Sequence, residues 1–276
     1  MNYLELNCEI FPPRHTEIVM AAFSDYGFES FEETARGFRA YIPEHQFDEK
    51  TFNTLEIFDH KEIKINYALK SIPDQNWNAV WESNFEPVEI GNRCYIRAPF
   101  HPSREGFEYE IIIEPKMSFG TGHHETTHQM VSLLLEQDVR GKEVLDMGCG
   151  TAVLAILAKK TGAAAVLAID NEEWAYNNSL ENIEKNNTPE IEVLHGDAAA
   201  IGSRLFDLIL ANINRNVLLK DIPTYAAALK QHGTILLSGF YETDVSQITK
   251  KAAQYNLKFI RYTTMNSWCA AVYTKD

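Results

Sequence analysis

The sequence has few cysteines and no pair of them in a metal-binding spacing. Its four cysteines, Cys8, Cys94, Cys149 and Cys269, are scattered without a C-x-x-C pair, so neither a cysteine zinc site nor a disulfide framework is expected. No apolar run reaches the roughly 18 residues that a membrane span needs. The start of the chain also lacks the basic-then-apolar layout of a signal peptide. We therefore expect a cytoplasmic protein with reduced thiols and no membrane partner.

Basic residues are scarce relative to acidic ones. The 276 residues include 25 Lys and Arg against 39 Asp and Glu, a formal net charge of -14. Because non-specific nucleic-acid binding depends on clustered cations, direct binding of nucleic acid is not expected. A basic protein partner suits this acidity better, and acidity that serves only solubility is the alternative. We expect the protein to act as a monomer.

From Gly141 onward, short apolar runs alternate with longer helical stretches. Strands are expected at 143–147, 164–170, 191–195, 206–212 and 234–238, and helices at 151–162, 171–187, 217–233 and 243–256. This alternation predicts an α/β fold with a doubly wound, mostly parallel sheet. The tail holds two strand-like runs around Met265-Asn266, so it is expected to close the sheet with an antiparallel hairpin.

The N-terminal part follows a different order of elements. Its predicted β-α-β-β-α-β pattern, with the second helix at 48–58, is that of a split βαβ, ferredoxin-like α+β domain. Residues 1–75 hold 14 Asp and Glu against 7 Lys and Arg. Residues 76–115 are rich in proline and turn residues. The expected division is an N-terminal domain (1–75), a partly structured linker region (76–115) and a larger domain (116–276).

Two glycines, Gly148 and Gly150, follow the first predicted strand of the larger domain. A turn from a first strand into its helix is where doubly wound sheets bind adenine-containing cofactors. The third glycine of a dinucleotide fingerprint is replaced by Val153, and Asp146 precedes the loop. This D-x-G-x-G form indicates S-adenosylmethionine, whose amino-acid tail and ribose need the close backbone approach that glycine permits. A plain strand-to-helix turn is the alternative.

Polar residues follow three further predicted strands. Asp170 lies about 20 residues past Gly150, the spacing at which a carboxylate reaches ribose hydroxyls. Asp197 follows the next strand, where it is placed to accept a hydrogen bond from the adenine amino group. Asn212 ends the fourth strand and is a candidate for orienting a substrate amine. The alternatives are helix N-caps for the aspartates and an Asx-turn for Asn212.

The stretch His124-Glu125-x-x-His128 fits the H-E-x-x-H pattern of zinc proteases. A zinc site would need both histidines on one helical face and a third ligand. The H-E-x-x-H-x-x-G-x-x-H extension is absent, and Glu136 is too close in sequence to replace it. We therefore expect no metal, and a zinc peptidase remains a remote alternative.

Four segments give the chain a close resemblance to a known family: MSFGTGHHETT, VLDMGCGTAVLA, AIDNEEWAYNNSLEN and ANINRN. Over nearly its whole length, the chain resembles the bacterial methyltransferases that modify ribosomal protein eleven of the large subunit. The linker adds matches at Trp77, Trp81, Phe85, Pro87 and Gly91. The FGTG lead-in is the most specific element, because other methyltransferases share the glycine loop without it.

The resemblance implies a class I, Rossmann-like domain that uses S-adenosylmethionine to methylate lysine side-chain and N-terminal amines of that ribosomal protein, free or on the ribosome. The N-terminal domain would recognise this partner. Contacts with S-adenosylmethionine are implied for Thr127, Gly148, Asp170 and Asn212, with Phe119 flanking the cofactor. A class I methyltransferase that acts on a small molecule or RNA is the alternative.

The chain departs from the family pattern in two places. Glu125 stands where the family usually has proline, and Asn214-Arg215 stands where small residues usually follow the asparagine motif. Both departures bear on contacts with the substrate rather than on cofactor binding.

Overall fold

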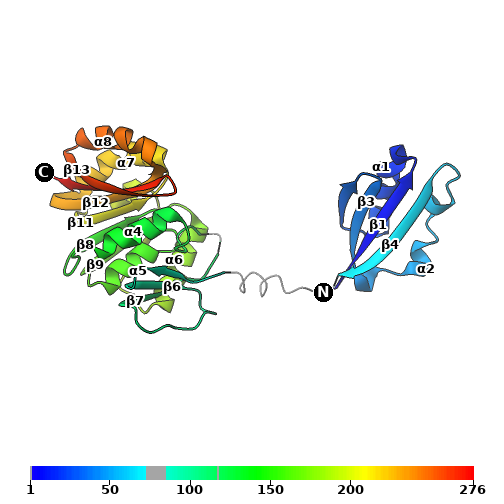
Figure 1. Cartoon of the computed structure of the whole chain (residues 1–276), viewed down its shortest axis with the longest axis horizontal. Helices are drawn as coiled ribbons and strands as arrows, with labels where there is room; N and C mark the ends of the chain where they lie inside the picture. The colour runs from blue at the N-terminus through cyan, green and yellow to red at the C-terminus, as the bar shows by residue number, and fades with distance from the viewer. Residues whose placement is uncertain (1, 73–84, 117) are drawn as a thin grey trace. The chain divides into compact units, whose positions relative to one another are not determined.

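A computed structural model describes residues 2–72, 85–116 and 118–276, and its contacts divide the chain into a unit up to Phe85 and a unit from Glu86 (Figure 1). Trp77, Trp81 and the first part of the expected linker lie outside the described residues. Within the described part of the chain, no helix is long and apolar enough to cross a membrane.

The N-terminal unit contains one antiparallel sheet and two helices. In chain order its elements are β1 (Tyr3–Phe11), α1 (Thr16–Tyr26), β2 (Ser30–Thr34), β3 (Gly37–Pro43), α2 (Glu49–Phe52) and β4 (Lys64–Ile72), with 3-10 turns at Pro13–His15, Glu44–Gln46 and Glu56–Asp59. The strand order β2-β3-β1-β4 confirms the split βαβ prediction. The predicted helix at 48–58 is interrupted after Phe52, where Asn53 and Thr54 are poor helix formers.

Alternation along β1 and helical spacing along α1 produce the core of this unit. Leu6, Cys8 and Ile10 are buried on one face of β1, as period-two spacing requires. Val19 and Phe23, four residues apart on α1, are fully buried against that face. The Phe23 and Phe52 ring centroids lie 4.8 Å apart, edge to face, so aromatic packing stabilises the small core.

A three-stranded sheet begins the second unit. It contains β5 (Val88–Ile90), β6 (Cys94–Arg97) and β7 (Tyr109–Ile112), in that order, with an antiparallel and then a parallel pair. Its buried residues join the same core as α4 (Glu125–Leu135) and α5 (Val153–Lys160). This part of the expected linker is therefore packed into the larger unit.

The main sheet has seven strands in the order β10-β9-β8-β11-β12-β14-β13. The strands are β8 (Glu143–Met147), β9 (Ala165–Asp170), β10 (Glu192–His195), β11 (Phe206–Asn212), β12 (Leu229–Tyr241), β13 (Leu257–Met265) and β14 (Trp268–Lys275). The remaining helices are α6 (Glu173–Lys185), α7 (Arg215–Ala228) and α8 (Val245–Ala253), with 3-10 turns at Ala198–Ile201 and Glu242–Asp244. The first five strands in the order are parallel, and the β13–β14 hairpin is antiparallel. The predicted doubly wound sheet and its closing hairpin are confirmed.

Helices cover both faces of this sheet. Successive strand residues alternate between two cores, so Val144 packs with α4 and α5 while Leu145 packs with α7 and α8. The predicted helix at 217–233 ends earlier, at Ala228, because Leu229 adopts an extended conformation and pairs with Phe206 in β11. The strand order reverses between β8 and β11, which creates the topological switch point where such sheets bind ligands.

Candidate active site

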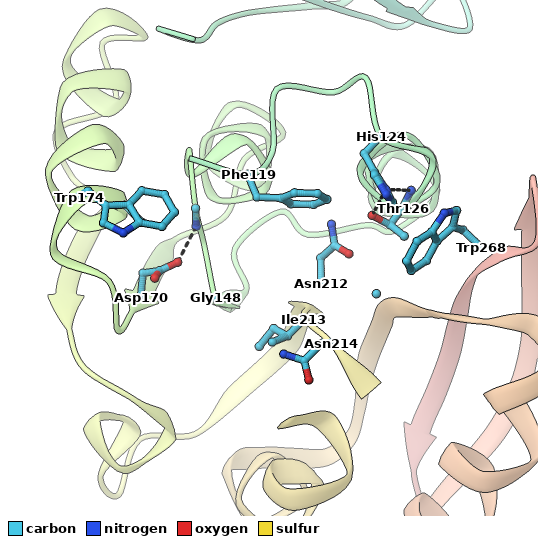
Figure 2. A pocket seen from close by; sticks show the side chains of 13 residues that line it. Phe119, His124, Thr126, Gly148, Asp170, Trp174, Asn212, Ile213, Asn214 and Trp268 are labelled. Atoms are coloured by element: carbon cyan, nitrogen blue, oxygen red, sulfur yellow. Dashed lines mark hydrogen bonds between the residues drawn. The ribbon is translucent and has the colours of Figure 1, made fainter. Parts of the chain in front are cut away.

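A pocket of about 290 Å³ lies at this switch point, outside the carboxyl ends of β8, β9 and β11. It is lined by Phe119, His124, Thr126, Gly148, Gly150, Asp170, Trp174, Ala175, Asn212, Ile213, Asn214, Gly239 and Trp268. Figure 2 shows Asp170 and Trp174 at one end and His124, Thr126 and Trp268 at the other. Four predicted site residues, Gly148, Gly150, Asp170 and Asn212, are therefore brought together.

Two positions of the glycine loop after β8 require a residue without a side chain. Gly148 and Gly150 have φ angles of 67° and 54°, in the left-handed region that favours glycine. A Cβ at Gly148 would lie 2.8 Å from Ile213 Cγ1, and one at Gly150 would lie 2.3 Å from the Phe119 carbonyl oxygen. The Thr151 amide also donates to that oxygen, at 2.9 Å. The loop and the FGTG lead-in are thus packed backbone to backbone.

Asp170 holds the loop and retains hydrogen-bonding capacity. One carboxylate oxygen accepts from the Gly150 amide at 2.8 Å, and the other accepts from the Glu172 amide at 3.0 Å. A carboxylate offers about four acceptor positions, so each oxygen can accept a further hydrogen bond from a ligand hydroxyl. Asp146, in contrast, is fully buried below the loop and accepts from the Ala155 amide at 3.0 Å. Burial raises the pKa of Asp146 to about 7.

Asn212 presents an unpaired oxygen at the end of β11. Its amide nitrogen donates to Thr127 Oγ1 at 3.4 Å, whereas its Oδ1 is buried and has no partner among the described residues. Figure 2 shows the amide between the Phe119 and Trp268 rings. An unpaired buried acceptor destabilises the folded protein by about 1–3 kcal/mol. A bound ligand that donates a hydrogen bond to this oxygen would remove that destabilisation, so the oxygen is suited to bind a donor.

Two predicted cofactor-binding residues do not line the pocket. Thr127 is buried in α4 behind Asn212 and accepts its hydrogen bond. Asp197 is exposed, and its side chain caps the following 3-10 turn by accepting from the Ala199 amide at 2.9 Å. Their contacts with the cofactor remain predictions.

Two residues of the HETTH stretch, His124 and Thr126, line the pocket. His124 is the N-cap of α4, and its Nδ1 accepts from the Thr126 amide at 3.2 Å. Its ring packs edge-on against Phe119 and Trp268. His128 follows one turn later and is partly buried, which lowers its pKa. Among the described residues, no group of three or more His, Cys, Asp or Glu side chains is arranged to hold a metal ion.

Comparison with known proteins identifies the family. The model of the ribosomal protein L11 methyltransferase (PrmA) family matches residues 17–276. The chain belongs to this family. A ribosomal protein L11 methyltransferase of Phocaeicola vulgatus is 46% identical over 98% of each chain, and one of Porphyromonas gingivalis is 44% identical over 94% of this chain and 91% of its own. The crystal structure of a ribosomal protein L11 methylase from Lactobacillus delbrueckii subsp. bulgaricus has a TM-score of 0.64 at 25% identity, covering 70% of this chain and 99% of that one.

The family assignment confirms the class I methyltransferase fold and S-adenosylmethionine as the cofactor. The pocket residues fit this molecule. Asp170 has acceptor capacity suited to the ribose hydroxyls, and the glycines allow close approach of the ligand to the backbone. Trp174, half exposed at the start of α6, offers an apolar face beside Asp170 that suits the adenine ring (Figure 2).

The sequence does not predict the roles of two asparagines at the C-terminal end of α6, one inside the helix and one at its C-cap. Asn182 and Asn186, one turn apart, bind the backbone of the segment that leads to Phe119. Asn186 exchanges hydrogen bonds with the amide and carbonyl of Ile112, at 2.9 and 2.6 Å. Asn182 accepts from the Glu114 amide at 2.8 Å and donates to the Thr151 carbonyl at 3.0 Å. Because these partners are distant in sequence, the pattern of α6 alone carried no signal for them.

Replacing Asn182 by alanine is expected to destabilise the larger unit. The change leaves the Glu114 amide and the Thr151 carbonyl without a protein partner, and each buried orphan costs about 1–3 kcal/mol. We expect the free energy of unfolding to fall by about 2–4 kcal/mol in urea titrations followed by circular dichroism. Asn177→Ala, at an exposed position of the same helix, is the matched control. Equal unfolding midpoints for the two variants would refute the role of Asn182.

Proposed function

We propose that the protein transfers methyl groups from S-adenosylmethionine to lysine side-chain and N-terminal amines of ribosomal protein L11. The observation that carries this proposal is the unpaired, buried Oδ1 of Asn212 in the cofactor pocket. An amine nucleophile brings N–H donors that match this acceptor. The names of the relatives support the choice of ribosomal protein L11 as the acceptor.

The residues of the pocket suit a direct transfer. Held by the glycine loop and Asp170, S-adenosylmethionine would supply an electrophilic methyl group: as the amine nitrogen bonds to the methyl carbon, the carbon–sulfur bond would break and S-adenosylhomocysteine would leave. Free lysine has a pKa of about 10.4, so its side chain is mostly an ammonium at neutral pH. The ammonium must release a proton to solvent before the neutral amine can attack the methyl group. The rings of Phe119, His124 and Trp268 border the pocket and would remove part of the hydration shell of a bound lysine, which disfavours the ammonium form. Asn212 Oδ1 then accepts an N–H and directs the nitrogen lone pair toward the methyl group, so catalysis rests on positioning.

The N-terminal unit is the part of the chain that we propose binds the protein substrate. The N-terminal unit would recognise ribosomal protein L11, either free or on the ribosome, and its 14 Asp and Glu against 7 Lys and Arg within residues 1–75 support a basic protein rather than RNA. Action as a monomer, without direct binding of nucleic acid, also belongs to the proposal. Cytoplasmic location stays a prediction.

The test is methylation of purified ribosomal protein L11 by the purified protein and S-adenosylmethionine, followed by peptide mass mapping. We expect methyl groups on lysine and N-terminal amines. Parallel reactions contain large-subunit ribosomal RNA or a panel of small amines in place of the protein. Transfer to RNA or to a small amine, with none to ribosomal protein L11, would favour the alternative class I methyltransferase.

A further inference from the structure

A second hollow, of about 310 Å³, adjoins the cofactor pocket. Its lining is Asn214, Arg215, Asn216, Gly239, Phe240, Tyr241, Asp244 and Trp268. Three of these residues, Asn214, Gly239 and Trp268, also border the cofactor pocket. Trp268 therefore stands between the two hollows, at the end of the pocket away from Asp170 and Trp174 (Figure 2).

Helix α4 fixes the backbone around Trp268. The buried Gln129 side chain donates to the Trp268 carbonyl at 3.1 Å and accepts from Thr263 Oγ1 at 2.8 Å. The turn of the hairpin is tied to the same helix, since Asn266 donates to a Glu125 carboxylate oxygen at 2.8 Å. Both strands of the hairpin and its turn are thus attached to α4. Trp268 consequently has a defined position at the rim of the pocket.

The rings around Trp268 form an aromatic surface with an acidic neighbour. Its ring centroid lies 4.2 Å from that of Tyr241 and 4.8 Å from that of His124. Tyr241 is 47% exposed, so its ring is open to a ligand. Asp244 lies in the same hollow and pairs with Arg215 at 2.9 Å. Faces of tryptophan and tyrosine attract ammonium groups, and they bind methylated ammonium groups especially well.

We propose that Trp268 and Tyr241 form the acceptor subsite, which takes the alkylammonium end of a lysine side chain. This inference rests on the proposed function and adds a specificity-determining surface to it. The cofactor-binding features, Asp170 and the glycine loop, lie at the other end of the pocket, which leaves the Trp268 end for the methyl acceptor. The aromatic faces draw the protonated lysine to the rim of the pocket, where the ammonium loses its proton to solvent before the neutral amine enters. The same faces stabilise the positive charge that develops on nitrogen during methyl transfer. An uncharged or anionic acceptor would gain nothing from this surface.

The test compares Trp268→Ala, Trp268→Phe and Tyr241→Ala in the full-length protein, with purified ribosomal protein L11 as the probe. For Trp268→Ala and Tyr241→Ala, we expect kcat/KM for the acceptor to fall roughly 5- to 30-fold. This range corresponds to the loss of one cation–π contact. Trp268→Phe keeps an aromatic face and should retain most of the activity. The Kd for S-adenosylmethionine, measured by calorimetry, should stay within about twofold. Peptide mass mapping should show fewer multiply methylated products.

Trp174→Ala is the reciprocal control, because this ring borders the opposite end of the pocket. It should weaken S-adenosylmethionine binding and leave KM for ribosomal protein L11 unchanged at saturating cofactor. The subsite is overturned if both alanine variants keep wild-type kcat/KM, or if Trp268→Ala weakens cofactor binding as much as Trp174→Ala does. Failure of the wild type to methylate ribosomal protein L11 would overturn the proposed function, and the subsite with it. The wild-type assay therefore tests the proposed function separately, and the variants test the subsite only if the wild type is active.

Discussion

Replacing Asp170 by alanine should weaken S-adenosylmethionine binding by at least about 100-fold, because each of the two charged hydrogen bonds that we propose between its carboxylate and the ribose hydroxyls is worth about 1.5–3 kcal/mol. Asp170 is 7% exposed, and its carboxylate already accepts hydrogen bonds from the Gly150 and Glu172 amides. Its removal therefore also frees the Gly150 end of the loop. Calorimetric titration with S-adenosylmethionine measures the loss directly.

Asp170→Asn separates the two contributions. It keeps the size of the side chain and one acceptor oxygen, so it should retain part of the loop structure while losing the charge. Glu173→Ala removes an exposed carboxylate nearby that does not line the pocket, and it should bind like the wild type. Near wild-type affinity in Asp170→Ala would show that the cofactor ribose lies elsewhere.

Replacing Asn212 by alanine should lower kcat by about 100-fold, the usual effect of misplacing a reacting group by about 1 Å. Cofactor affinity should change much less, because the Asp170 end of the pocket is untouched. We expect the loss of kcat because the substrate amine would no longer have the Asn212 Oδ1 atom as an acceptor for its N–H. In the structure this oxygen has no hydrogen-bond partner among the described residues. Single-turnover methylation of ribosomal protein L11, at saturating concentrations of both substrates, measures the transfer step itself.

Thr127→Val tests how Asn212 is held. The substitution removes the hydroxyl that accepts from the Asn212 amide nitrogen at 3.4 Å and nearly preserves the volume of a buried side chain. We expect a smaller loss of kcat than in Asn212→Ala. If Asn212→Ala left kcat unchanged while Thr127→Val reduced cofactor affinity, Thr127 would be the cofactor-binding residue and Asn212 would not orient the amine.

Hydrophobic periodicity predicted the larger unit well because its strands are buried on both faces. The strands Glu143–Met147 and Phe206–Asn212 have the expected bounds, since continuous apolar runs leave little choice of conformation. Helix ends were predicted less accurately. The early end of α7 follows from pairing between Leu229 and Phe206, a tertiary contact that overrides local propensity.

The part of the site that lies on consecutive strand ends could be predicted from spacing. Gly148, Gly150, Asp170 and Asn212 all line the pocket, because carboxyl ends of parallel strands meet at one edge of the sheet. Trp268 could not be predicted in this way. It reaches the pocket through antiparallel pairing of β14 with β12, where it lies opposite Tyr241.

The departures from the family pattern lie around Trp268, at the end of the pocket that we propose for the methyl acceptor. Glu125 binds Asn266 in the hairpin turn next to Trp268. Asn214 borders both hollows, and Arg215 pairs with Asp244 in the second one. That these departures bear on substrate contacts stays a prediction.

The central claim is tested most directly by the methylation state of ribosomal protein L11 isolated from the source organism with and without the gene for this protein. Intact-protein mass spectrometry should show methylated ribosomal protein L11 in the parent and unmethylated protein in the deletion strain. A plasmid-borne wild-type copy should restore the methyl groups, whereas an Asp170→Ala copy should not. Ribosomal protein L11 that carries the same methyl groups in the parent and in the deletion strain would contradict the account.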